Sequence, residues 1–401
     1  MFSLIRNAIM RKITDDVIYI GLDDFDIDLF ESQYKVPQGV SYNSYLILDE
    51  KIAILDTADA GKGEEWETNL KKALGERKPD YLVVHHLEPD HSSMIARVLE
   101  IYPDIRIVTG ARAAKMIPQF FNTPDIGSRC IEMKEGDVLD LGKHKLHFYA
   151  APMVHWPEVM VSFDEFDGAL YSADAFGKFG ALSKFGFYSS EDPDWSEEAR
   201  RYYINIVGKY GAQVQNLLKK ASALPIKSIR PLHGPIINED LGKYIKLYDI
   251  WSSYSPESKG IMIAVASIYG GTMKAAEKLK ELLESKGAEN VFTRDLCRTD
   301  ISRNVSDAFR YDKLVLAASS YDNGLFTPMY NFLHILQIKC YAGRTVGIIE
   351  NGSWAPSAAR VMNEMLCQMS NLTIVEPVVT IRSRMKSTDY PALEHLADAL
   401  L

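Results

Sequence analysis

The densest group of potential metal ligands lies in residues 85–91, which read HHLEPDH. This segment follows an apolar stretch, 81–84, that is typical of a buried strand. Four of its side chains carry the imidazole or carboxylate groups that metals bind: His86, Glu88, Asp90 and His91. Pro89 stiffens the segment because its ring fixes φ, and alternate side chains of an extended chain share one side. The spacing therefore predicts a metal cluster with nitrogen and oxygen ligands rather than a lone ion.

The same segment also has a structural interpretation. Asp90 could cap the helix that is expected to begin near His91, while the other polar side chains face solvent. In an extended chain the side chains of His85 and His86 point to opposite sides. We therefore predict that His85 supports the structure or a ligand and does not itself bind a metal.

Three later residues of metal-binding type each follow a predicted strand: His155 in PMVHWP, Asp174 in YSADAFG and His233 in IRPLHGP. Each by itself is more often structural, because a histidine among apolar residues is commonly a hydrogen-bonded core residue. Together they indicate a function, since four of the nine histidines in the chain lie at strand ends of this kind.

A second type of chemistry is indicated by a glycine-rich turn between a predicted strand, 261–266, and a predicted helix, 273–286. The turn consists of Ser267, Ile268, Tyr269, Gly270, Gly271 and Thr272. Backbone amides and hydroxyls at the N-terminus of a helix can surround a phosphate. The turn has no lysine and no GxxxxGK[ST] pattern, which disfavours a nucleotide triphosphatase. A plain tight turn is the alternative.

Two further loops strengthen the phosphate interpretation. The first contains Ser319, Ser320, Tyr321, Asp322, Asn323 and Gly324, and the second contains Asn351, Gly352, Ser353 and Trp354. Both follow predicted parallel strands, and such sheets bind ligands at the carboxyl ends of their strands. Tyr321 and Trp354 could flank a planar ring.

The elements that must position these residues fall into two parts. Strand-like segments at 17–22, 44–48, 52–55, 81–85, 145–149, 159–163 and 169–172 accompany helical periodicity at 64–74, 94–101 and 196–221. This mixture predicts an antiparallel or mixed sheet with helical layers. Serines, a proline and a glycine in 251–260 indicate a linker. We therefore expect one domain at 1–254 and another at 255–401.

After the linker, strands and helices alternate regularly. Strands are predicted at 261–266, 291–293, 314–318, 345–349 and 373–379, and helices at 273–286, 302–309, 330–336 and 357–369. This alternation is typical of a doubly wound parallel sheet.

Composition excludes several classes of protein. The 401 residues are 47% hydrophobic and 25% charged, as in an ordinary globular chain, and the net charge of -9 argues against nucleic-acid binding. No apolar run is long enough to span a bilayer, and residues 1–16 lack the pattern of a secretory signal. The four cysteines are widely scattered, which excludes a local iron–sulfur or rubredoxin motif and fits a reducing cytoplasm: Cys130, Cys297, Cys340 and Cys367.

The metal motifs resemble those of the metallo-β-lactamase superfamily, whose usual HxHxDH pattern stands here as HxExDH with Glu88 in place of a histidine. A carboxylate there makes the site richer in oxygen, which suits iron better than zinc. With HWP, DAFG and the flavodoxin-like second half, the whole chain resembles the flavodiiron proteins, or A-type flavoproteins. The resemblance implies a metallo-β-lactamase-like αββα sandwich followed by a flavodoxin-like doubly wound sheet.

The resemblance also implies site residues and cofactors. One iron would bind His86, Glu88 and His155, and the other would bind Asp90, His91 and His233, with Asp174 bridging them. In some members of the family the histidine equivalent to His91 does not bind the metal. FMN would occupy the three loops of the second half, with its phosphate on Ser267, Tyr269, Gly270, Gly271 and Thr272. Many members have Gln-His where this chain has Lys178 and Phe179.

The implied activity is reduction of dioxygen to water, of nitric oxide to nitrous oxide, or of both, with electrons delivered through FMN. Family members are head-to-tail homodimers or dimers of dimers. We expect no fused rubredoxin or nicotinamide module before the end at Leu401, so electrons would come from a separate rubredoxin-like protein or a reduced deazaflavin. Two alternatives remain open: a dinuclear zinc hydrolase fused to a flavodoxin domain, and a non-enzymatic electron carrier.

Overall fold

The computed structural model describes residues 10–401 and separates them into two compact units. The first comprises the chain up to Tyr203 together with Ala212–Tyr248, and the second comprises Ile204–Gly211 and Asp249–Leu401. Residues 1–9, which carry much of the segment tested above for a secretory signal, lie outside the described part. The predicted linker is too long, because α8 (Leu241–Ser252) and β17 (Ser258–Ala266) leave only residues 253–257 between them.

The first unit contains two large sheets. One has the order β1 (Arg11–Lys12), β2 (Val17–Tyr19), β7 (Tyr45–Leu48), β8 (Ile52–Leu55), β9 (Tyr81–Val83), β10 (Arg106–Gly110), β11 (Cys130–Met133). The other has the order β12 (Val138–Asp140), β13 (Lys145–Ala150), β14 (Met160–Asp164), β15 (Ala169–Tyr171), β16 (Ser228–Arg230). Both combine antiparallel with parallel pairs, which confirms the predicted mixed sheet.

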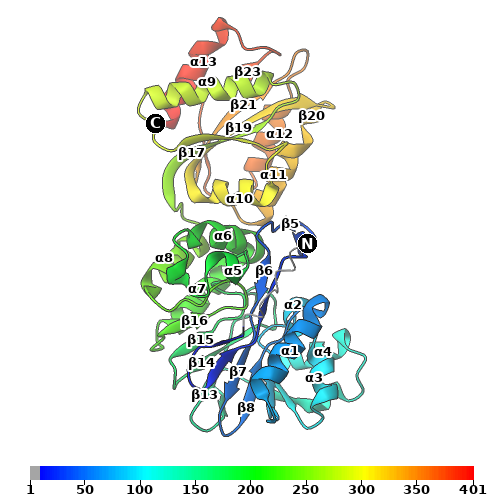
Figure 1. The fold of residues 1–401 in the computed structure, drawn as a ribbon. Coiled ribbons are helices and arrows are strands. Elements are labelled where there is room, and N and C mark those ends of the chain that lie inside the picture. Colours follow the sequence, from blue (N-terminus) through cyan, green and yellow to red (C-terminus); the bar gives the residue numbers. More distant parts are fainter. Residues whose placement is uncertain (1–9) are drawn as a thin grey trace, which may run out of the picture. The chain divides into compact units, whose positions relative to one another are not determined.

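The two sheets pack face to face. One continuous core combines side chains of the first sheet, such as Tyr45 and Leu55, with side chains of the second, such as Phe148 and Tyr171. Helices cover the outer sides, with α1 (Gly63–Leu74), α3 (Ile95–Ile101) and α4 (Ala111–Phe120) on one side and α7 (Gly211–Ala221) and α8 on the other (Figure 1). The result is the expected four-layer αββα sandwich.

The helix predicted over 196–221 is wrong as a continuous element. It divides into α6 (Trp195–Tyr202), a π-helical turn (Tyr203–Val207), a 3-10 turn (Gly208–Tyr210) and α7. A β-carbon at Gly211 would lie 2.3 Å from the carbonyl oxygen of Ser252, so the chain approaches its neighbour too closely for a larger residue. Apolar periodicity does not detect such a break, because the buried positions continue through it.

The second unit is the doubly wound sheet that the alternation predicts. Its strand order is β18 (Val291–Asp295), β17, β19 (Tyr311–Tyr321), β21 (Thr345–Asn351), β22 (Thr373–Ile374), with β23 (Val379–Ile381) also paired to β21. These pairs are all parallel, and the order matches that of flavodoxin-like folds. The last predicted strand is split into β22 and β23 around Pro377, which cannot donate a ladder hydrogen bond.

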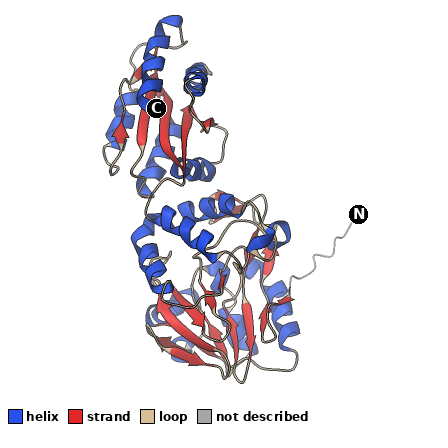
Figure 2. Ribbon diagram, turned by 90° about the vertical axis from the view of Figure 1, so that its left-hand side faces the viewer, coloured by secondary structure: helices blue, strands red, loops and turns tan. Residues whose placement is uncertain are grey.

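Helices cover both faces of this sheet, as the view in Figure 2 shows. Residues of α9 (Gly271–Ser285) and α13 (Tyr390–Leu400) share one core with the strands, while α10 (Ile301–Arg310), α11 (Thr327–Ile338) and α12 (Ala358–Leu366) complete the unit. The predicted flavin residues lie at the carboxyl ends of β17, β19 and β21, although residues 319–321 and Asn351 are the last residues of β19 and β21 and not loop residues, and Gly324 begins the short strand β20 (Gly324–Leu325).

Candidate metal and flavin sites

The seven predicted metal ligands meet at one place in the first unit, from four separate loops. After β9, His86 and Glu88 precede the short helix α2 (Pro89–Ser92), and Asp90 and His91 lie within it. His155 lies between β13 and β14, Asp174 follows β15, and His233 follows β16. All four histidines and Asp174 are buried.

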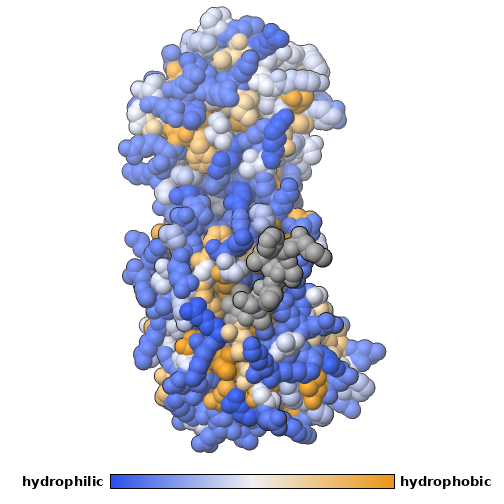
Figure 3. Space-filling model, viewed as in Figure 1, coloured by the Kyte–Doolittle hydropathy of each residue, from blue (hydrophilic) through white to orange (hydrophobic). Residues whose placement is uncertain are grey.

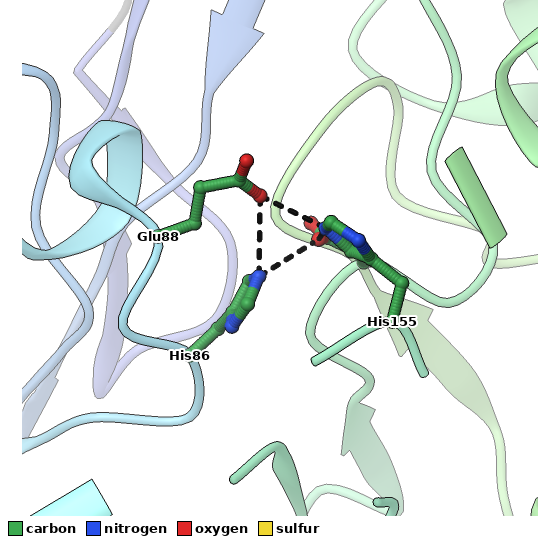
Figure 4. Close-up of side chains that lie close together, drawn as sticks. His86, Glu88 and His155 are labelled. Carbon is green, nitrogen blue, oxygen red and sulfur yellow. Dashed lines mark hydrogen bonds and ion pairs between the residues drawn. The ribbon is translucent and has the colours of Figure 1, made fainter. Parts of the chain in front are cut away.

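The first group of potential ligands consists of His86, Glu88, His155 and Asp174, each with one ligand atom within 4.8 Å of the others. Oε2 of Glu88 lies 3.2 Å from Nε2 of His86 and 2.9 Å from Nε2 of His155. Oδ2 of Asp174 lies 3.3 and 3.1 Å from the same two nitrogens. In Figure 4 the labelled side chains point toward one another. Two carboxylates and two imidazoles can hold one cation in this arrangement.

The second group consists of Asp90, His91 and His233, again with ligand atoms within 4.8 Å. Oδ2 of Asp90 lies 3.5 Å from Nε2 of His91 and 3.2 Å from Nε2 of His233. Oδ1 of Asp174 lies 3.4 Å from Nε2 of His91 and 3.8 Å from Nε2 of His233. Asp174 therefore presents one oxygen to each group, which is the geometry of a carboxylate shared by two cations.

Several buried ligand atoms have no hydrogen bond within the described residues. These are both carboxylate oxygens of Asp90 and of Asp174, both ring nitrogens of His91, and Nε2 of His233. Burial of polar atoms without a partner is costly. A pair of cations would provide the missing partners, so the donor set fits a dinuclear metal centre.

The electrostatics agree with this fit. Burial alone would lower the pKa of His155, but the nearby carboxylates of Asp174 and Glu88 raise that pKa to about 9. For His86, burial is again outweighed, chiefly by Asp174, and its pKa is raised well above the ordinary value. The carboxylates that favour a positive charge on these rings would equally favour a bound cation.

Contacts behind the potential ligands orient them. Nδ1 of His86 lies 2.8 Å from Oε1 of Glu158, and Nδ1 of His233 lies 2.7 Å from the backbone oxygen of Ser41. Each contact leaves Nε2 of the ring facing the ligand group. The sequence patterns did not single out Glu158. A carboxylate inside the apolar run WPEVMVSF is nevertheless a sign of a buried, paired side chain.

His85 belongs to neither group. Its Nδ1 lies 2.6 Å from Oδ2 of Asp56, and its Nε2 lies 2.8 Å from Oγ of Ser162. Both ring nitrogens are therefore engaged with the protein, and the side chain links β8, β9 and β14.

Tyr202 is a second residue that sequence reasoning missed. Its ring lies 5.6 Å from that of His233, and its buried hydroxyl makes no hydrogen bond to any described residue. Burial, with the charges of Asp174 and nearby carboxylates, raises its pKa well above that of an ordinary tyrosine. The ring of Tyr202 thus lies beside a candidate metal ligand, just before the π-helical turn, and its raised pKa keeps the hydroxyl protonated.

Lys178 and Phe179 have packing roles. The ammonium of Lys178 forms a buried ion pair with Asp192 and lies 3.8 Å from the centre of the Phe185 ring. Burial lowers the pKa of Lys178, and Asp192 opposes that shift. The ring of Phe179 lies 5.1 Å from that of Tyr202. Lys178 belongs to neither ligand group, while Phe179 helps to enclose the tyrosine.

The second unit contains a cavity of about 570 Å³ at the carboxyl ends of its strands. It is lined by most of the predicted flavin residues and by two that were not predicted: Ser267, Ile268, Tyr269, Gly271, Thr272, Ser319, Ser320, Tyr321, Asp322, Asn323, Asn351, Gly352, Ser353, Trp354, Ala355 and Ser383. Gly270 and Gly324 do not line it. Gly270 instead allows the turn, because its φ of 83° is one that other residues rarely adopt.

The lining of this cavity suits a phosphate-bearing planar ligand. Gly271 begins α9, and Oγ1 of Thr272 lies 2.9 Å from Oγ of Ser319. Among the described residues, the lining includes no lysine or arginine, so a phosphate would be bound by backbone amides and hydroxyls at the helix N-terminus. Tyr269 and Trp354 are almost fully exposed and available to a planar ring.

A third cluster of metal-binding residue types lies elsewhere in the first unit: His144, Asp164 and Asp167. Nδ1 of His144 lies 2.6 Å from Oδ2 of Asp164, and Arg230 pairs with Asp167 at 3.1 Å. The carboxylates therefore have cationic partners within the protein, and this cluster is an ion-pair network.

Within residues 10–401, no helix combines the length and the apolar character that a membrane span requires. The face shown in Figure 3 is mostly hydrophilic, with scattered hydrophobic patches.

Comparison with known proteins places these features in context. The sequence model of the family described as ODP family beta lactamase matches residues 40–234. The chain is 30% identical over 380 residues to a nitric oxide reductase of Moorella thermoacetica, and the match covers 92% of each chain.

Solved structures are similar over nearly the full length. The rubredoxin oxygen:oxidoreductase of Desulfovibrio gigas matches with a TM-score of 0.91 and 25% identity, covering 98% of this chain and 97% of that one. The flavodiiron protein of Giardia intestinalis matches with a TM-score of 0.88 and 22% identity, covering 97% and 95%, which shows the shared fold.

Proposed function

The chain belongs to the flavodiiron proteins and is an oxidoreductase, and from this premise we propose that it reduces dioxygen to water, nitric oxide to nitrous oxide, or both. The relatives support both gases, since one is named a nitric oxide reductase and another a rubredoxin oxygen:oxidoreductase. When bound, a pair of irons would hold and reduce the gas with electrons supplied through FMN.

The observation that carries the proposal is the placement of Asp174 between two ligand groups. We assign His86, Glu88 and His155 to one iron and Asp90, His91 and His233 to the other, with Asp174 bridging. Its Oδ2 lies 3.1 Å from Nε2 of His155 and its Oδ1 lies 3.4 Å from Nε2 of His91. Three carboxylates among seven ligands give an oxygen-rich site that favours iron over zinc.

Both reductions consume protons as well as electrons. The hydroxyl of Tyr202 lies in the region of the ligand groups and has no hydrogen-bond partner among the described residues. We assign it the role of a hydrogen-bond donor toward the bound gas. The aromatic rings around it, including Phe179, keep bulk water away from that hydroxyl.

The cavity of the second unit is assigned to FMN. The amides and hydroxyls of the turn at 267–272 would bind the phosphate, and the loops at 319–324 and 351–354 would hold the ring system. Reduction of either gas consumes electrons, which must come from outside the protein's own side chains. We propose a rubredoxin-like protein or a reduced deazaflavin for this role.

The assembly and cellular location are inferred from the family and the composition. We propose a head-to-tail homodimer, or a dimer of such dimers, as in other members of the family. The four cysteines are free thiols, which fits the reducing cytoplasm.

Anaerobic kinetics test the function directly. The protein, loaded with iron and FMN and reduced chemically, is mixed with dioxygen or with nitric oxide in separate experiments. Flavin reoxidation coupled to loss of the gas is the expected result for at least one gas. A fully loaded protein that consumes neither gas, or that purifies with zinc as its native metal, would overturn the proposal.

A further inference from the structure

We propose that Glu158 makes the two metal subsites unequal, so that the subsite of His86 holds its metal more tightly than the subsite of His91. The His86 subsite is defined as His86, Glu88 and His155, and the His91 subsite as Asp90, His91 and His233. The inference rests on the proposed dinuclear centre and adds a positioning residue to it.

The two subsites have matching sets of potential ligands. Each has two imidazoles and one carboxylate of its own, and each faces one oxygen of Asp174. Because the ligand types match, the groups behind the ligands are the main chemical difference between the two subsites.

Behind the His86 subsite lies a fully buried carboxylate. Oε1 of Glu158 lies 2.8 Å from Nδ1 of His86 and accepts a hydrogen bond of 3.0 Å from the backbone N–H of Leu87. The side chain of Glu158 has no exposed surface. One oxygen thus fixes both the ring of His86 and the backbone next to it, and it fixes the tautomer that turns Nε2 toward the metal.

A carboxylate in this position also strengthens the ligand. A negatively charged acceptor on the N–H of an imidazole raises the basicity of the opposite nitrogen, and hydrogen bonds to a charged group are stronger than neutral ones. Both effects favour a divalent cation at Nε2 of His86.

Behind the His91 subsite the support is weaker. Nδ1 of His233 lies 2.7 Å from a neutral acceptor, the backbone oxygen of Ser41. Nδ1 of His91 is buried and has no hydrogen bond to a described residue. Within the described chain, neither imidazole of this subsite has a carboxylate behind it, so its geometry and basicity are less well determined.

The difference should be measurable as metal retention. Loss of such an outer partner typically lowers metal affinity by about 10–100-fold. The wild-type chain should therefore release its two metals in two separate steps, with the His91 subsite emptied first.

The test uses the full-length, iron-loaded protein under anaerobic conditions. Ferrous iron is removed with increasing concentrations of a chromogenic chelator, and the iron released per chain is read from the absorbance of the chelator complex. The variants are Glu158→Gln, which keeps the shape and an oxygen acceptor but loses the charge, and His91→Ala, which marks the weaker subsite. Asp164→Asn is the matched control, because it makes the same change in a buried histidine–carboxylate pair away from both subsites.

The expected result is a two-step release curve for the wild type and for Asp164→Asn. In Glu158→Gln the chelator concentration that removes the more tightly held iron should fall at least about tenfold. The concentration that removes the other iron should stay the same. His91→Ala should lack the weaker step and keep the tighter one.

An unchanged curve for Glu158→Gln, an equal shift of both steps, or loss of the tighter step in His91→Ala would overturn the inference. Gas turnover of the wild type is measured in parallel, so that the two proposals can fail separately. A wild type that binds two irons and reduces a gas while Glu158→Gln releases iron normally would contradict only the inference. A wild type that never holds two metals would contradict the proposed function.

Discussion

Oδ2 of Asp174 lies 3.1 Å from Nε2 of His155, and the same oxygen lies 3.3 Å from Nε2 of His86. The second oxygen of this carboxylate is directed to His91 instead. A side chain that serves two ligand groups at once is hard to replace, because both oxygens and the negative charge are used.

Replacement of Asp174 by asparagine should therefore abolish gas reduction. The amide keeps the size of the side chain but loses the charge and one anionic oxygen. We expect turnover to fall at least about 100-fold, which is the upper end of the loss seen when a residue that only hydrogen-bonds to a metal ligand is replaced. FMN content should stay the same, because the flavin cavity lies in the other unit. Near-normal turnover in Asp174→Asn would show that the bridging assignment is wrong.

A Tyr202→Phe variant should separate chemistry from assembly. The lost hydroxyl has no hydrogen-bond partner in the described protein, so the free energy of unfolding should be unchanged or slightly higher, and iron and FMN contents should be normal. If the hydroxyl donates a hydrogen bond that stabilises the reacting gas, turnover should fall by roughly 100-fold.

Tyr341→Phe is the control for this experiment, because Tyr341 also has a buried hydroxyl that forms no hydrogen bond with any residue from 10 to 401, but it lies in the second unit. Its turnover should match that of the wild type. Equal turnover of the wild type and Tyr202→Phe would remove the tyrosine from the mechanism.

The seven candidate metal ligands could be picked out from the sequence because they lie in the loops that follow strands or at the start of a helix, where local patterns are readable. Glu158 could not be found in the same way, since its contact with His86 joins residues 72 positions apart. That contact depends on the packing of β13 and β14 beside β9. Similarly, Tyr202 lies inside an apolar helical pattern, and only the π-helical turn after it distinguishes it from an ordinary core residue.

The flavin cavity shows the same limit. Its loops could be identified by their position after parallel strands, but Ser383 follows a strand that the sequence did not resolve from its neighbour. The carbonyl oxygen of Ser383 would lie only 2.4 Å from a β-carbon at position 271. Glycine at that position is therefore required by tertiary contact and not only by the turn.

The pH dependence of stability should reveal the ion pair between His144 and Asp164. Burial opposes the charge, but the hydrogen bond and charge of Asp164 raise the pKa of His144 above its ordinary value. A raised pKa means that the folded state favours the protonated ring, so the stabilisation is complete below the unfolded value near 6.5 and is lost as pH rises through the folded value. Asp16, Asp167 and Lys143 face the same region and share in its charge balance.

His144→Gln should therefore lose more free energy of unfolding relative to the wild type at pH 6 than at pH 9. Urea denaturation at the two pH values measures both differences, and a hydrogen bond to a charged group contributes roughly 1.5–3 kcal/mol. Asp164→Asn should show the same trend, since it removes the other half of the pair. A difference that grows with pH would contradict the assignment.

Gly271→Ala should impair flavin binding without unfolding the protein. A β-carbon at Gly271 would lie 2.4 Å from the carbonyl oxygen of Ser383, so the turn or the 383 loop must move, and both line the cavity. This movement displaces the backbone amides that we assign to the phosphate. Because these donors belong to the backbone, a change of side-chain rotamer cannot restore their positions. We expect a loss of FMN affinity on the order of tenfold or more, if one charge-assisted hydrogen bond of about 1.5 kcal/mol is lost. Fluorescence titration of the flavin-depleted, full-length protein with FMN measures this affinity.

Gly242→Ala is the control, because a β-carbon there meets no atom within 4 Å, and its FMN affinity should equal that of the wild type. Wild-type affinity in Gly271→Ala would mean that the turn at 267–272 does not hold the phosphate.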